Sequence, residues 1–151
     1  MSSTVVSRLI NAPSRAVYRA FLDPDALAAW LPPDAMRGVV HAFDGRQGGA
    51  IRMSLIYPEG GTRGKTSENT DTFQARIVEL VPETRIVWTV HFESTDPSFA
   101  GEMVMTTTLA STGDGTTVTI RCDKVPPGIS PQDNAAGCRA SLEKLSAFLD
   151  R

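Results

Sequence analysis

The stretch SPQDNAAGCRASLEKLSAFLD, residues 130–150, decides which fold this sequence can adopt. Ser130 is a typical helix N-cap, and Pro131 suits the first turn of a helix. The apolar residues that follow recur at steps of three and four, which predicts one helix of about twenty residues, roughly 30 Å long. Its apolar stripe consists of Ala135, Cys138, Leu142, Leu145 and Leu149. A helix of that length needs a wide apolar partner.

The middle of the chain supplies that partner, because its hydrophobic pattern changes to a period of two. The pattern predicts strands at residues 4–10, 39–43, 50–57, 70–80, 84–92, 102–112 and 116–122. Glycine pairs between several of these segments, such as Gly48-Gly49, supply the positive φ angles that hairpin turns need. The sequence therefore predicts an antiparallel sheet of six or seven strands.

Two short helices are expected directly after the first strand. Val17, Phe21, Leu27 and Trp30 are spaced as on helices, and Asp23-Pro24 breaks the pattern between them. We therefore expect a single α+β domain over residues 1–151, in which a curved antiparallel sheet wraps around the long C-terminal helix.

Composition excludes several classes of protein. The chain has 151 residues and a net charge of −2, with 15 basic and 17 acidic residues, so it offers no electrostatic footprint for nucleic acid. It contains neither an apolar run long enough for membrane insertion nor a signal-peptide pattern. Cys122 and Cys138 do not form a C-x-x-C motif. We expect a cytoplasmic protein with two free thiols.

The segment YPEGGTRGKTSEN, residues 57–69, ends in a fragment that resembles a P-loop, Gly64-Lys65-Thr66. A P-loop needs a glycine where Glu59 stands, and it needs a helix after the threonine to present its N-terminus to the phosphates. The residues that follow are polar and β-prone. We therefore expect no nucleotide at this loop.

In its order of motifs the chain resembles the START-like, or helix-grip, superfamily of the pollen-allergen and polyketide-cyclase type. More closely, it resembles the branch of homologues of the activator of the heat-shock-protein-90 ATPase. The resemblance rests on INAPSRAVYRAFLDPDALAAWLPP, FDGRQGGAIRM, ARIVELVPETRIVWT, GDGTTVTI and the final helix. It implies an apolar cavity between sheet and helix, which in many relatives holds a lipid-like, sterol-like or polyketide-like molecule.

Strand alternation predicts which side chains face that cavity. Inward positions are expected at 51, 53, 55 and 57, at 86, 88, 90 and 92, at 103, 105 and 109, at 118 and 120, and at 39, 41 and 43. The predicted lining comprises Trp30, His41, Met53, Leu55, Trp88, Val90, Met103, Met105, Cys138, Leu142 and Leu145. Such a wall suits a small hydrophobic molecule, and plain core packing is the alternative reading of each residue.

Catalytic chemistry has little support in the sequence. No G-x-S-x-G elbow occurs, and His41 and His91 lie too far apart in sequence to form a zinc signature, so no metal or other cofactor is expected. A cyclase or dehydratase working in the cavity is the first alternative function, with His41 and Tyr57 as its candidate acid and base. A co-chaperone role is the second. The eukaryotic activators that it resembles carry a further N-terminal domain, and we expect none beside the helix-grip region here, so the family name alone gives little support for a chaperone partner.

Overall fold

The computed structural model describes residues 2–58 and 69–150, and the Gly64-Lys65-Thr66 fragment lies outside them. Along the chain the elements are β1 (Ser2–Ile10), α1 (Ser14–Phe21), α2 (Pro24–Trp30), β2 (Arg37–Phe43), β3 (Ala50–Ile56), β4 (Thr70–Val81), β5 (Arg85–Phe92), a 3-10 turn (Pro97–Phe99), β6 (Met103–Thr112), β7 (Gly115–Val125) and α3 (Pro131–Leu149). The expected strands, the helix pair and the final helix are all present.

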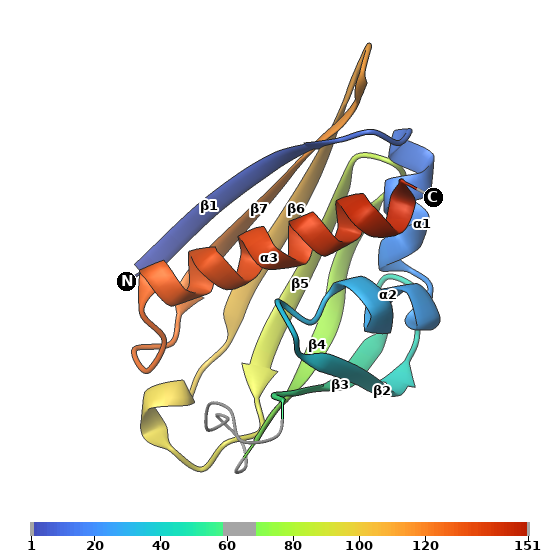
Figure 1. Cartoon of the computed structure of the whole chain (residues 1–151). Helices are drawn as coiled ribbons and strands as arrows, with labels where there is room; N and C mark the ends of the chain where they lie inside the picture. Colours follow the sequence, from blue (N-terminus) through green and yellow to red (C-terminus); the bar gives the residue numbers. More distant parts are fainter. Residues whose placement is uncertain (1, 59–68, 151) are drawn as a thin grey trace.

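The strands form one antiparallel sheet of seven strands in the order β1-β7-β6-β5-β4-β3-β2. Figure 1 shows the sheet curving around α3, with α1 and α2 gathered at the end where the chain terminates. The predicted α+β helix-grip fold is confirmed. Helix α3 packs mainly against β1, and also against α2, β7 and α1.

The two halves of α3 are held differently. The Ser130 hydroxyl accepts a hydrogen bond from the Asp133 N–H at 3.0 Å, so the predicted N-cap is confirmed. In the C-terminal half, Ser141 donates to the Leu31 carbonyl at 2.5 Å, and Leu142 and Leu145 are buried. None of the residues in the N-terminal half is fully buried. The C-terminal half is therefore buried and bonded to the residue that follows α2, whereas the residues of the N-terminal half are at most partly buried.

The corner between α1 and α2 is a rigid part of the core. The Trp30 indole N–H donates to the Ala20 carbonyl at 2.9 Å, which satisfies one of the carbonyls that the end of α1 leaves without a helical partner. The rings of Phe21 and Trp30 meet edge to face, with centroids 4.6 Å apart. Asp23 caps α2 by accepting from the Asp25 N–H at 2.9 Å. This corner closes one end of the interior.

The expected strand faces are correct on four strands, and on β2 they are correct for Phe43 but wrong for Val39 and His41. Positions 51 and 53, 86, 88 and 90, 103 and 109, and 118 and 120 are buried as expected. On β2, however, Val39 and His41 are exposed, whereas Val40 and Phe43 pack against the core. The pairing of β2 with β3 shifts register between Val40 and Ala42, and such a bulge reverses the faces of the residues around it. His41 therefore does not face the interior.

Candidate functional site

The candidate site lies between the concave face of the sheet and the N-terminal half of α3. Trp88 on β5 is paired with Met105 on β6, and Met105 is paired in turn with Cys122 on β7. Cys122 lies next to α3, with its sulfur 3.9 Å from that of Cys138. Met105 and Cys138 are both only partly buried. Solvent therefore reaches the concave face beneath this half of the helix.

The remaining predicted lining residues surround that region. Trp30, Leu142 and Leu145 are at most 1% exposed and close the end nearest α1 and α2. Met53, Val90 and Met103 are buried on the concave face. Leu55 is partly buried near the opposite end. The structure brings ten of the eleven predicted lining residues to the interior side, with His41 as the exception.

His41 instead belongs to a hydrogen-bond chain on the outer face of the sheet. Its Nε2 lies 2.8 Å from the Ser54 hydroxyl, and Ser54 lies 2.8 Å from the Thr72 hydroxyl. Ser54 is buried on the face that the alternation had assigned to solvent. Because His41 lies on the face opposite the cavity, the expected pairing of His41 with Tyr57 as acid and base is wrong.

Tyr57 lies just beyond β3 and bonds to a buried carboxylate. Its hydroxyl donates to Asp71 Oδ2 at 3.0 Å, and Asp71 is only 2% exposed. Burial is the largest cause that raises the pKa of Tyr57 to about 12, and the charge and hydrogen bond of Asp71 add to it. The phenol therefore stays protonated at neutral pH.

Sequence reasoning missed Asp71, although the pattern contained a signal. Asp71 shares the alternation of Phe73, Ala75 and Ile77, all of which are buried on the concave face of β4. An acidic residue in the apolar phase of a strand indicates a carboxylate that points inward. The Tyr57–Asp71 pair thus places a polar group at the end of the site away from α1.

The other polar contacts tie the first turns of α3 to the β1–β7 side of the sheet. Thr4 donates to the Asn134 side chain at 2.5 Å, and the Asn134 amide lies 3.9 Å from the Met103 sulfur. The sulfur atoms of Cys122 and Cys138 are 3.9 Å apart, and both cysteines are free. The hydrogen bond between the two thiols is the main cause that lowers the pKa of Cys122. These contacts hold the helix on one side and leave the accessible side toward β3, β4 and β5.

Deep in the site, the Trp88 indole N–H has no hydrogen-bond acceptor among the described residues, although Trp88 is only 2% exposed. The Phe21 ring approaches the Trp88 ring edge-on, with centroids 6.2 Å apart. The site is thus mainly apolar, with one unpaired donor inside it.

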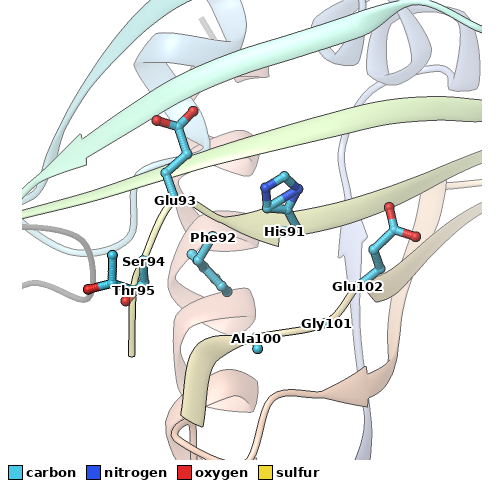
Figure 2. A pocket seen from close by; sticks show the side chains of 8 residues that line it. All are labelled: His91, Phe92, Glu93, Ser94, Thr95, Ala100, Gly101 and Glu102. Carbon is cyan, nitrogen blue, oxygen red and sulfur yellow. The ribbon is translucent and has the colours of Figure 1, made fainter. Parts of the chain in front are cut away.

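A second, open hollow of about 560 Å³ lies where β5 ends and residues 93–102 begin. Figure 2 shows His91 and Glu93 on one side of the chain and Phe92 on the other. Glu93 binds Arg52 through two contacts, of 2.6 and 2.9 Å, and accepts from Gln74 at 3.0 Å. This network lowers the pKa of Glu93 to about 2, chiefly through the Arg52 hydrogen bond. Of the two carboxylates that line this hollow, Glu93 and Glu102, Glu93 is therefore already engaged in a structural ion pair.

Within residues 2–58 and 69–150, no group of three or more histidine, cysteine, aspartate or glutamate side chains is placed to hold a metal ion. No helix in the same part of the chain is long and apolar enough to cross a membrane.

The family described as "Activator of Hsp90 ATPase homolog 1-like protein" matches residues 11–150. The chain belongs to this family. The resemblance to the START-like superfamily drawn from the sequence motifs is thereby confirmed. Membership supports a module that binds a ligand or acts as a co-chaperone.

Solved structures that resemble this member of the Activator of Hsp90 ATPase homolog 1-like family share its fold. A Chromobacterium violaceum protein is 36% identical to the chain, with a TM-score of 0.87 over 99% of this chain and 97% of its own. A Rhodobacter sphaeroides protein, at 21% identity, has a TM-score of 0.78 and covers 99% and 92%. The AHSA1-like protein from Aeromonas hydrophila shares the fold at 17% identity, with a TM-score of 0.75 over 99% and 92%. No curated protein matches the chain.

Proposed function

We propose that this member of the family binds a small hydrophobic molecule, of a lipid-like, sterol-like or polyketide-like kind, between the sheet and α3. The observation that carries the proposal is the partial exposure of apolar side chains on both sides of the interior, Met105 on the sheet and Cys138 on the helix. Water in contact with such a surface is displaced favourably by an apolar ligand.

The wall can adapt to ligands of different shape. Met53, Met103 and Met105 all face the interior, and unbranched thioether side chains fill irregular gaps at small cost. The C-terminal half of α3 is fixed to the residues directly after α2. Ser141 donates to the Leu31 carbonyl, and Lys144 donates to the Pro32 carbonyl at 2.6 Å. The ligand is therefore expected to enter beneath the N-terminal half of α3.

The exposed apolar residues favour this role over a co-chaperone surface. The large apolar side chains exposed in the described part of the chain are Val5, Leu9, Val39 and Val78. They lie on β1, β2 and β4, and β1 and β2 are the two opposite edges of the sheet. A protein-docking patch would need such residues to be contiguous.

Native mass spectrometry of the protein purified without added ligand, followed by organic extraction, tests the proposal. A thermal-shift screen of lipids, sterols and aromatic polyketides extends the test to molecules lost in purification. We expect a co-purifying apolar molecule, or a ligand that raises the melting temperature by several degrees.

A matched pair of variants locates the binding site. Met105→Trp should fill the accessible space and abolish binding while the protein stays folded, whereas Thr108→Trp, on the exposed face of the same strand, should leave binding intact. If Met105→Trp instead destabilises the protein by about 1–3 kcal/mol, as overpacking of a full core does, and no ligand binds to the wild type, the interior is closed and the proposal fails.

A further inference from the structure

The two tryptophans of the chain occupy similar environments but differ in one contact. Trp30 is 0% exposed and Trp88 is 2% exposed, and each packs against the ring of Phe21. The Trp30 N–H donates to the Ala20 carbonyl at 2.9 Å. The Trp88 N–H has no acceptor within the described residues. It is therefore a buried side-chain donor that the described residues leave unpaired.

An unpaired donor at this depth calls for an explanation. More than nine-tenths of buried polar groups in proteins are hydrogen-bonded, because leaving one unpaired is costly. The neighbours of Trp88 on the adjacent strands are Ile77 and Met105, which offer at most a weakly accepting thioether. Among the described residues no acceptor reaches this N–H, so a molecule that enters the site can supply one.

The position of Trp88 makes such a contact accessible. Its cross-strand partner Met105 is partly exposed beneath α3, and directly opposed side chains on neighbouring strands lie about 5 Å apart. Phe21 and Trp30 close the interior beyond it. Trp88 thus lies at the inner end of the proposed binding space.

The charges around the interior restrict the chemistry of the acceptor. The buried polar and charged residues among those described are Thr4, Ser14, Ser54, Asp71, Thr107, Thr116 and Ser141. They include a carboxylate and no lysine, arginine or histidine. A ligand carboxylate or phosphate at Trp88 would be a buried anion without a cation, which is far more costly than a buried neutral oxygen.

We propose that the Trp88 indole N–H donates a hydrogen bond to a neutral oxygen, a carbonyl or hydroxyl, carried by the apolar part of the ligand. This inference rests on the proposed function and specifies its ligand class: an uncharged, oxygenated hydrophobic molecule in preference to a plain hydrocarbon or an anion. A site with a buried donor discriminates against analogues that leave the donor unpaired. Trp88 is then a residue that determines specificity.

The test uses two probes of the same shape, 9-fluorenone, which has a ring carbonyl, and fluorene, which has a methylene in its place. Affinities are measured by titration calorimetry or fluorescence for the wild type and for Trp88→Phe, which keeps an aromatic ring and removes the N–H. We expect fluorenone to bind the wild type about 5- to 10-fold more tightly than fluorene, and the ratio to fall to about 1 in the variant. The anion 9-fluorenecarboxylate should bind the wild type more weakly than fluorene.

Nuclear magnetic resonance supplies a readout that needs no variant. A ¹H–¹⁵N spectrum shows two indole signals, one for each tryptophan, and the Trp30 signal serves as the internal control because its N–H is already bonded. Fluorenone should move the Trp88 proton downfield while leaving the Trp30 proton nearly in place. Fluorene should produce no downfield shift of either.

The outcomes separate the two proposals. If both probes bind with equal affinity and the Trp88 proton does not move downfield, the hydrogen bond is disproved while the hydrophobic site stands. Tighter binding of the carboxylate would disprove the preference for a neutral oxygen. If neither fluorenone nor fluorene binds, both proposals fail.

Discussion

Comparing Trp30→Phe with Trp88→Phe isolates the energetic cost of the unpaired N–H. Both substitutions shorten a fully buried ring by the same atoms, so the cost of the lost packing is similar and largely cancels in the difference. Trp30→Phe also removes the 2.9 Å bond to the Ala20 carbonyl and leaves that carbonyl buried without this donor. Trp88→Phe removes a donor that has no acceptor among the described residues.

The expected difference follows from these two effects. An unpaired buried polar group costs about 1–3 kcal/mol. Trp30→Phe adds this cost, because the Ala20 carbonyl loses its donor. Trp88→Phe removes it, because the unpaired N–H is no longer present. We therefore expect Trp30→Phe to lower the free energy of unfolding by about 2–6 kcal/mol more than Trp88→Phe does.

Equilibrium urea unfolding followed by far-ultraviolet circular dichroism measures this difference without relying on tryptophan fluorescence. The samples must first be freed of co-purifying small molecules, as checked by native mass spectrometry, because a bound ligand would stabilise the wild type. If Trp88→Phe costs as much as Trp30→Phe, the Trp88 N–H has a partner inside the protein, and the argument for a ligand acceptor is refuted.

Three further predictions concern acid stability, helix capping and packing. The Arg52 contact that lowers the pKa of Glu93 from 4.5 to about 2 stabilises the fold fully above pH 4.5, and this contribution is lost as the pH falls toward 2. Glu93→Gln should flatten that part of the acid-unfolding curve, and a curve with unchanged slope would contradict this role. Ser130→Ala should lower the free energy of unfolding by about 1 kcal/mol, measured in urea, because its hydroxyl caps α3; no change would mean that water replaces the cap. Gly38→Ala should lower the melting temperature, because its methyl group would lie 2.7 Å from a proline ring carbon and 2.9 Å from a carbonyl oxygen of α2, while Gly113→Ala, with nothing within 4 Å, should not.

Most of the fold could be predicted because its signals are local. The stripe and the Ser130 cap predicted α3, and the break at Asp23-Pro24 separated α1 from α2. Period-two alternation gave the strands and most of their inward faces, including those of Met53 and Trp88. In each case neighbouring residues in the sequence determine the backbone conformation, so a single sequence is sufficient.

The candidate site depended on contacts between distant segments. His41 was assigned inward because alternation was carried through β2, but the register shift against β3 turned it outward. Asp71 is buried because Tyr57 and the interior cover it. Trp88 has no acceptor among residues 2–58 and 69–150, and its directly paired neighbours on β4 and β6 are Ile77 and Met105.

The sequence by itself determined the elements of this protein, their order and the apolar faces that drive them together, since hydrogen bonding and side-chain periodicity act over a few residues. Only the tertiary structure decided which half of α3 is anchored by Ser141 to α2 and which half leaves Met105 accessible. The same holds for the unpaired Trp88 donor. Whether a side chain is buried, and whether its hydrogen-bonding groups are paired, depends on residues that the fold brings together from distant parts of the chain. Ser141 and Leu31, for example, are 110 positions apart in sequence.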